Sequence, residues 1–253
     1  MLRAIFERFR QGHRTVGFPA EPPALPDRMR GRPDVDFSKC PDGCRECAEA
    51  CPTGAIRVDG KNPVSLDLGR CLFCTDCVDA CPQGAIDYTR EYRMAARSKT
   101  DLLITGRTME LARELEARAK SLFGRSLKLR QVSAAGCNAC EADVNVLNTV
   151  VFDLGRFGIQ FVASPRHADG LLITGPVSKN MELALKKTYD AVPPPKIVIA
   201  VGACAISGGP YIDHPETRNG ADAVVPVDLY IPGCPPHPAT ILDGLLRLLG
   251  RIR

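Results

Sequence analysis

A cysteine pattern that occurs twice constrains the fold of this chain more than any other feature of its sequence. Three cysteines recur 30 positions later with the same spacing, and the residues after the last one also repeat, as Cys-Pro-Thr-Gly-Ala-Ile and Cys-Pro-Gln-Gly-Ala-Ile. The two sets are Cys44, Cys47 and Cys51, and Cys74, Cys77 and Cys81. The segment is therefore an internal duplication. One further cysteine precedes each copy, Cys40 in the first and Cys71 in the second.

The spacing in each copy is typical of iron–sulfur ligands. The second copy reads Cys-x-x-Cys-x-x-Cys-x-x-x-Cys-Pro, as in bacterial two-cluster ferredoxins. The first differs only by the extra residue between Cys40 and Cys44. Three closely spaced thiolates wrap one cluster, whereas the fourth, ahead of proline, ligates the other cluster. We therefore predict two [4Fe–4S] clusters with crossed ligands, one held by Cys40, Cys44, Cys47 and Cys81 and the other by Cys71, Cys74, Cys77 and Cys51.

Two alternatives remain for the duplicated segment. If Cys40 does not reach its cluster because of the extra residue at Gly43, a three-iron cluster would form instead. Paired Cys-x-x-Cys motifs also bind zinc, although eight thiols in two mirrored runs are unusual for zinc. Two adjacent clusters with no substrate pocket indicate electron transfer.

The second half of the chain contains the other four cysteines, Cys137, Cys140, Cys204 and Cys234. A Cys-x-x-Cys pair alone fits a redox disulfide, half a zinc site or an iron–sulfur site. Cys204 and Cys234, however, each follow an apolar, β-branched run. A disulfide between Cys137 and Cys140 would leave these two without a role, whereas a third [4Fe–4S] cluster uses all four.

Short β-rich runs alternate with helical stretches beyond Gly124, which indicates βαβ units and a mostly parallel sheet. Strands are predicted at 127–133, 158–163, 170–174, 196–201 and 226–231, and helices near 140–152, 179–189 and 237–249. Ligands bind outside the carboxyl ends of the strands in such a sheet. Because three of the four cysteines directly follow predicted strands, we expect the four thiols to meet there.

Four segments are predicted along the chain. Residues 1–36 form a basic amphipathic helix over about 1–10 and a proline-rich extended arm, and the apolar face of this helix docks on a partner, on a membrane surface or on its own protein. Residues 37–96 form an α+β, ferredoxin-like domain. Residues 97–126 form a linker helix, with an apolar stripe from Arg107 to Phe123 that ends at Gly124. Residues 127–253 form an α/β, flavodoxin-like domain.

The composition is that of a soluble globular protein, with 253 residues of which 45% are hydrophobic. A chain of this length needs no disulfide framework, and its first residues lack the apolar region of an export signal, so we expect a reducing cytoplasm. No run of about 18 apolar residues occurs, so membrane contact is expected through partner subunits. The net charge of +4 resides in residues 1–33, which hold seven arginines and three acidic residues. With no Trp and few aromatics, nucleic-acid binding is not expected.

Residues 127–253 resemble the iron–sulfur small subunit of group 4 membrane-bound [NiFe] hydrogenases. The resemblance is to the formate hydrogenlyase and hydrogenase-4 type, a relative of the B subunit of respiratory complex I. It is carried by Gly136-Cys-Asn-Ala-Cys-Glu141, Ser164-Pro-Arg-His-Ala-Asp169, Gly202-Ala-Cys204 and Pro232-Gly-Cys-Pro-Pro236. Residues 1 to about 104, including Gly69-Arg-Cys-Leu-Phe-Cys74, resemble the separate ferredoxin-like subunit of the same complexes. The chain thus resembles a fusion of two neighbouring subunits, and its Cys137-x-x-Cys140 pair is the hydrogenase form.

The resemblance implies partners and roles. The third cluster would be the one next to the nickel–iron centre of a separate large subunit, because the nickel ligands are not in this chain. Membrane-anchor subunits and an upstream ferredoxin-type, formate or carbon monoxide dehydrogenase partner are also implied. Glu141 matches an acid that assists proton movement at the large-subunit interface, or else is a carboxylate favoured by the helix dipole. His167 and His237 serve either structural hydrogen bonds or proton transfer.

The expected function is electron transfer through three [4Fe–4S] clusters in a membrane-associated [NiFe] hydrogenase whose catalytic metal lies in another subunit. We expect no catalytic residue in this chain beyond the proton-transfer role of Glu141. The protein is expected on the inner face of the cell membrane, bound through its partners. One alternative is the same relay in a complex I-like oxidoreductase that lacks nickel. The other is a free-standing ferredoxin.

Overall fold

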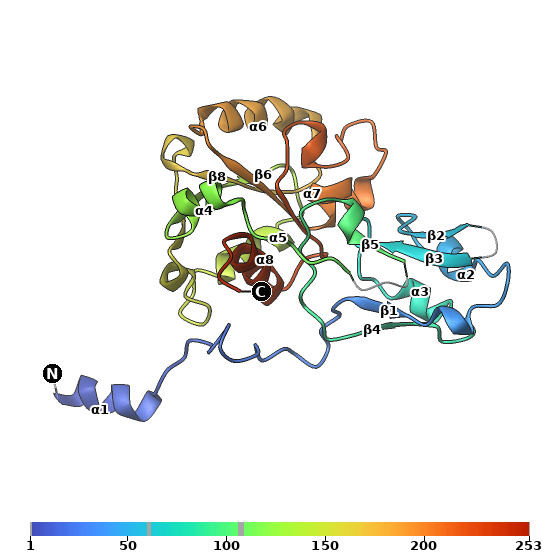
Figure 1. Cartoon of the computed structure of the whole chain (residues 1–253), viewed down its shortest axis with the longest axis horizontal. Helices are drawn as coiled ribbons and strands as arrows, with labels where there is room; N and C mark the ends of the chain where they lie inside the picture. Colours follow the sequence, from blue (N-terminus) through green and yellow to red (C-terminus); the bar gives the residue numbers. More distant parts are fainter. Residues whose placement is uncertain (1, 60–61, 106–108, 253) are drawn as a thin grey trace.

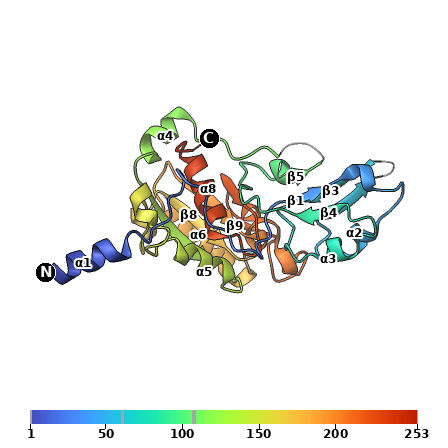
Figure 2. The same cartoon turned by 90° about the horizontal axis from the view of Figure 1, so that it is seen from below.

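Two domains follow one another along the chain in the computed structural model, which describes residues 2–59, 62–105 and 109–252. The larger, C-terminal domain is layered around one sheet, and the smaller domain packs beside it (Figure 1). Helix α1 (Leu2–Gln11) projects away from both (Figure 2). This arrangement brings the duplicated cysteine segment next to the C-terminal domain.

The larger domain is built on a five-stranded sheet with spatial order β10-β9-β8-β6-β7. The strands are β6 (Leu127–Ser133), β7 (Ile159–Phe161), β8 (Gly170–Thr174), β9 (Ile197–Val201) and β10 (Leu229–Ile231). Every neighbouring pair is parallel. Counted within this domain the order is 2-1-3-4-5, the flavodoxin-like order, in which the ligand site lies at the switch point between the first and third strands. Here that point lies between β6 and β8.

Both faces of the central strands are buried, which explains their continuous apolar sequences. Leu171 and Ile173 of β8 pack in one apolar cluster, and Leu172 packs in the other. The first cluster also includes residues of α6 (Lys179–Ala191) and α7 (Ala203–Ser207). The second includes residues of α5 (Ala139–Val146) and α8 (Pro238–Leu248). The predicted α/β architecture is confirmed, with α7 as a short helix that the sequence did not predict.

The smaller domain is α+β, and its duplication is visible in its elements. Each copy provides one short helix followed by one strand. These are α2 (Glu46–Glu49) and β2 (Ile56–Asp59), and α3 (Asp76–Asp79) and β4 (Ile86–Tyr88). Strand β4 pairs antiparallel with β1 (Pro33–Val35), and β2 belongs to a sheet with β3 (Asn62–Asp67) and β5 (Leu103–Ile104).

Short 3-10 helices occur in both domains, at Phe37–Lys39, Thr100–Leu102, Leu154–Phe157, Pro165–His167, Gly209–Tyr211 and Ala221–Ala223.

The segment between the domains is only partly helical, which corrects the helix predicted from Arg107 to Phe123. Helix α4 covers Ala117–Phe123 and ends at Gly124 as predicted, whereas 106–108 lie outside the described residues. The backbone amides of Ala112 and Leu115 donate to carbonyls of Ala95 and Leu248. These tertiary hydrogen bonds replace the bonds that a helix would have made. The apolar stripe therefore marks burial along an extended segment as well as a helix face.

Direct contacts fix the two domains against each other. Ala96 and Tyr230 form an antiparallel β-bridge with two backbone hydrogen bonds of 3.0 and 2.9 Å. Ser207 Oγ donates to the carbonyl of Gly69 at 2.8 Å, and Lys99 Nζ lies 2.7 Å from Asp222 Oδ2. One apolar cluster contains residues of both domains. Because packed interiors resist deformation, the spacing between sites on the two domains is set by this interface.

The proline-rich arm is extended, as predicted, and links the domains a second time. Near its start, the Val16 amide donates to the carbonyl of Val151, and Phe18 is buried in the core of the larger domain. Near its end, Gly31 and Arg32 donate through their amides to the smaller domain. The arm therefore acts as a strap across the two domains.

Candidate metal centres

The twelve cysteines are all free thiols, and they gather in three groups of four. The first group lines one small pocket in the smaller domain. Its members are Cys40, Cys44, Cys47 and Cys81. Burial raises the pKa of Cys47 to about 11, and the charges of Cys81 and Cys44 act in the same direction. These four are one of the sets that the spacing predicts, and Cys40 lies with the others despite the extra residue.

The second group lines a second small pocket in the same domain. It consists of Cys51, Cys71, Cys74 and Cys77. Burial raises the pKa of Cys71 to about 12. The last cysteine of each copy thus lies with the first three of the other copy. The duplication is therefore crossed in space, as the ferredoxin spacing predicts.

The two copies hold their last cysteine in the same way. The amide of Ala55 donates to Cys51 Sγ at 3.2 Å, and the amide of Ala85 donates to Cys81 Sγ at 3.3 Å. The glycine before each alanine has a positive φ, +58° for Gly54 in the first copy. This left-handed conformation turns the amide back toward the sulfur, and it favours glycine. The repeated Gly-Ala is therefore explained by a hydrogen bond to each sulfur.

One sulfur contact has no counterpart in the other copy. The Tyr88 hydroxyl lies 3.5 Å from Cys71 Sγ, and burial raises the pKa of Tyr88, so the phenol remains protonated and can donate. The first copy has Val58 at the matching position. Tyr88 is no part of the cysteine pattern, although this difference between the copies is visible in the sequence.

The third group lies at the carboxyl ends of the strands of the larger domain. Cys137 follows β6, Cys140 is in the first turn of α5, Cys204 is in the first turn of α7, and Cys234 follows β10. Burial is the main cause that raises the pKa of Cys204 to about 12, and the charges of Cys234 and Cys137 raise it further. Burial, followed by the charge of Cys204, also raises the pKa of Cys140. The four thiols therefore interact electrostatically with one another.

Glycine allows the backbone to pass close to this third group. A Cβ at Gly202, where φ is +89°, would lie 2.5 Å from Cys140 Sγ. A Cβ at Gly209 would lie 2.8 Å from Cys204 Sγ. Any side chain at Gly202 would therefore displace a sulfur of the group.

The chemistry of the three groups fits iron–sulfur clusters. Massed thiols with raised pKa values stay protonated unless bound cations stabilise the thiolates. In the described ranges no three His, Cys, Asp or Glu side chains are placed to hold a single metal ion. A four-iron cluster binds each thiolate through a different iron, so its ligands surround a volume rather than one point. Thiols around a cavity are the arrangement that such a cluster requires.

Glu141 occupies the switch point of the sheet. Its side chain is buried, and Oε1 accepts hydrogen bonds of 2.6 Å from Ser133 Oγ and from Thr174 Oγ1, the last residues of β6 and β8. Burial acts to raise the pKa of Glu141, but these two hydrogen bonds outweigh it, so the pKa is lowered. The second oxygen is buried and has no hydrogen-bond partner among the described residues. The carboxylate is therefore held charged, with one oxygen free.

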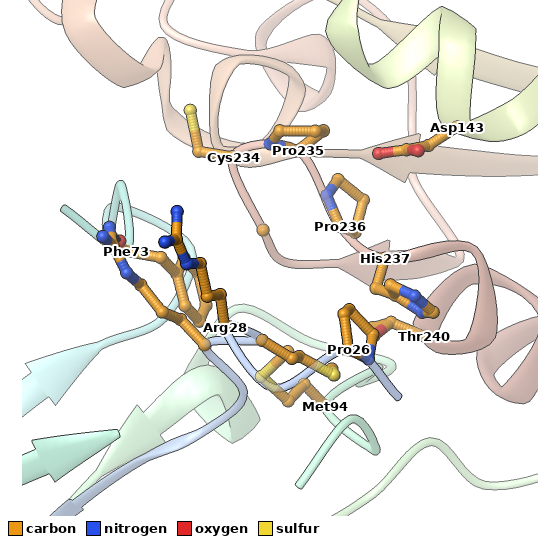
Figure 3. Close-up of a pocket in the computed structure, with 13 residues that line it drawn as sticks. Pro26, Arg28, Phe73, Met94, Asp143, Cys234, Pro235, Pro236, His237 and Thr240 are labelled. Carbon is orange, nitrogen blue, oxygen red and sulfur yellow. Dashed lines mark hydrogen bonds between the residues drawn. The ribbon is translucent and has the colours of Figure 1, made fainter. Parts of the chain in front are cut away.

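A cavity of about 350 Å³ lies at the junction between the second and third groups (Figure 3). Phe73 of the smaller domain, Arg28 of the arm and Cys234 of the larger domain all line it. Arg30 Nη1 donates to the carbonyl of Phe73 at 2.8 Å. The charge of Cys74 contributes to the raised pKa of Cys234, after burial and the charge of Cys137. The second and third groups are therefore electrostatic neighbours across the domain interface.

His237 and His167, the two histidines noted in the sequence, lie on different elements. His237 caps α8, because its Nδ1 accepts from the amide of Ala239 at 3.1 Å, and burial lowers its pKa. This supports the structural interpretation of His237. His167 ends the 3-10 helix Pro165–His167, and its role stays a prediction.

The fold and the thiols define a class of protein in which a ferredoxin-like domain is followed by an α/β domain with four thiols at the carboxyl ends of its strands. Residues 137–248 match the family model of the NADH ubiquinone oxidoreductase 20 kDa subunit, and residues 39–85 match that of the 4Fe-4S dicluster domain. The chain belongs to the family of the 20 kDa oxidoreductase subunit and its hydrogenase relatives. The resemblance to hydrogenase subunits is thereby confirmed.

Two curated relatives carry hydrogenase names. The probable membrane-bound hydrogenase subunit mbhJ of Pyrococcus furiosus is 41% identical over 143 residues, which are 55% of this chain and 86% of the relative. Formate hydrogenlyase subunit 7 of Escherichia coli is 46% identical over 126 residues, 50% of this chain and 49% of that protein. The chain thus spans about half the length of the second relative.

A solved structure is also similar. It is titled as the membrane-bound sulfane sulfur reductase, an archaeal respiratory membrane complex, with 36% identity, a TM-score of 0.47, and coverage of 54% of this chain and 75% of that one. No helix of the described residues has the length and apolar character needed to span a membrane.

Proposed function

We propose that this chain is an electron-transfer subunit whose twelve cysteines bind three [4Fe–4S] clusters. Such clusters exchange single electrons when bound. The proposed ligand sets are Cys40, Cys44, Cys47 and Cys81; Cys51, Cys71, Cys74 and Cys77; and Cys137, Cys140, Cys204 and Cys234. The observation that carries the proposal is the grouping of the thiols by fours in three neighbouring places. The proposed cluster domains are residues 37–96 and 127–253.

The second set is proposed as the middle of the relay. The charge of Cys77 from this set contributes to the raised pKa of Cys47 in the first set. Across the domain interface, the charge of Cys74 contributes to the raised pKa of Cys234 in the third set. The middle set is therefore close to both others, and the packed interface holds these spacings constant.

The proposed terminus is the nickel–iron site of a partner large subunit beside the third set. Two relatives of this chain are named as hydrogenase or formate hydrogenlyase subunits, which supports such a partner. Membrane-anchor subunits and an upstream ferredoxin-type or formate or carbon monoxide dehydrogenase partner belong to the same proposal. Glu141, held charged with one oxygen free, is proposed to pass protons at the large-subunit interface.

Metal analysis of the intact complex tests this function. The complex is purified anaerobically through a tag on this chain, and iron, sulfide, nickel and zinc are measured. We expect iron and sulfide for three clusters per chain, with stoichiometric nickel in the complex. Full iron without nickel would leave the relay but remove the hydrogenase terminus. Purification of the chain alone, with no large subunit, would favour a free-standing ferredoxin.

A further inference from the structure

Helix α1 exposes an apolar face that nothing in the described chain covers. None of its residues is buried. Four of its apolar side chains are exposed, Leu2 by 76%, Ile5 by 51%, Phe6 by 75% and Phe9 by 84%. The helix projects from the body of the protein in both views (Figures 1 and 2). Contiguous exposed apolar side chains of this kind mark a surface that binds something.

The helix is also too short to be stable in water without support. It has ten residues, and isolated helices below about 12–15 residues are marginally stable in water. Its side-chain hydrogen bonds stay local, as in the bonds of Arg8 with Gly12 and His13. A surface that covers the apolar face would therefore also stabilise the helix itself.

The order of residues around the helix indicates the kind of surface. At about 100° per residue, Ile5, Phe9, Leu2 and Phe6 fall within an arc of about 100°. Arg8 borders one side of this arc, and Arg10 and Arg3 border the other. Glu7, the one acidic residue of α1, lies on the opposite face, where it pairs with Arg10 at 3.6 Å. The apolar face is thus bordered by positive charge on both sides.

We propose that α1 lies in the headgroup layer of an anionic lipid membrane, parallel to its surface. In that position the apolar side chains enter the acyl boundary and the flanking arginines reach lipid phosphates on both sides. The acid points to water. A protein groove would have to supply acidic partners on both walls, whereas a lipid surface has phosphates on all sides. Membrane binding by α1 is separate from electron transfer and does not depend on the clusters.

Vesicle flotation of the full chain provides the first test. The vesicles are phosphatidylcholine with or without one quarter phosphatidylglycerol, at low and high salt. We expect at least tenfold more chain with anionic vesicles, and a loss of at least tenfold for Phe6→Ser/Phe9→Ser. The double variant Arg8→Gln/Arg10→Gln should lose the preference for anionic lipid. Leu183→Ser, which removes an equally apolar side chain exposed by 61% on α6, should bind like wild type.

Fluorescence gives a second, site-specific readout, because the chain has no tryptophan. In Phe6→Trp the single tryptophan should shift its emission to shorter wavelength when anionic vesicles are added. In Leu183→Trp the emission should not move. Unchanged emission from Phe6→Trp, or equal flotation with neutral vesicles, would overturn the proposal. So would protection of α1 only in the presence of partner subunits, since the helix would then dock on protein.

Discussion

Thr174 Oγ1 donates a hydrogen bond of 2.6 Å to Glu141 Oε1, and this bond ties the end of β8 to the first turn of α5. Ser133 makes the matching bond from the end of β6. Thr174 and Ser133 are register partners in the sheet. One carboxylate oxygen is thus fixed at the point where the strand order reverses, close to the third thiol group.

Replacement of this threonine should destabilise the protein. Thr174→Val removes a donor to a buried carboxylate, and we expect a loss of about 1.5–3 kcal/mol of unfolding free energy at pH 7. Although burial acts to raise the folded-state pKa of Glu141, the hydrogen bonds lower it overall. Their stabilisation is therefore present above the unfolded pKa of about 4.3 and is lost as the pH falls through the folded value. Anaerobic urea unfolding at pH 7 measures the loss. Thr174→Ser keeps the hydroxyl and should retain most of the stability; an equal loss in both variants would contradict this role.

Single cysteine variants should reveal the crossed ligand sets. Cys51→Ser and Cys74→Ser should remove the same cluster, although the two residues belong to different copies of the duplication. Low-temperature electron paramagnetic resonance of the reduced, anaerobic chain distinguishes the signals of the three clusters. Cys47→Ser should remove the signal of a different cluster from the one that Cys51→Ser and Cys74→Ser remove. If Cys51→Ser matched Cys47→Ser instead, each copy would hold its own cluster.

Alanine at Gly202 should remove the third cluster alone. The added Cβ meets Cys140 Sγ at 2.5 Å. The backbone there has φ +89° and ψ 156°, a region used almost only by glycine, which adds roughly 1–3 kcal/mol of strain. Iron content should fall by one cluster per chain while the ferredoxin-like signals remain. Gly12→Ala is a control for positive φ without a close contact, because its φ is +62° and no atom lies within 4 Å of the new Cβ. Full iron content in Gly202→Ala would show that the backbone there need not approach the thiol.

The Tyr88 hydroxyl should tune one cluster only. A donor to a ligating sulfur stabilises the more negative, reduced state, so Tyr88→Phe should lower the midpoint potential of the middle cluster. Loss of a hydrogen bond worth about 0.5–1.5 kcal/mol corresponds to roughly 20–65 mV. Redox titration followed by electron paramagnetic resonance measures the shift. Tyr92→Phe, at a tyrosine that packs on Phe18, should leave all potentials unchanged.

The sequence was sufficient for features that depend on local pattern. The apolar runs predicted the five parallel strands, because central strands buried on both faces have continuous apolar sequences. The cysteine spacing predicted the sets of thiols that now line common cavities, since each ligand loop is short and local. That these thiols bind clusters stays a prediction.

Other features depend on contacts that form only in the folded chain. Residues near Ala112 read as helix, but their amides bond to Ala95 and Leu248, which are distant in sequence. Ser133 and Thr174 meet at Glu141 only once β6 and β8 pair. The approach of Cys74 to Cys234 likewise requires the two domains to dock. No periodicity or spacing encodes these three relationships.

A reductive titration of the anaerobic complex, followed by electron paramagnetic resonance with iron and zinc analysis of the same sample, tests the central claim most directly. We predict three one-electron signals from this chain and about twelve irons in it. The signal of the middle cluster should show magnetic interaction with the signals of both other clusters. Stoichiometric zinc, or disulfides in place of the cluster signals, would contradict the proposed relay.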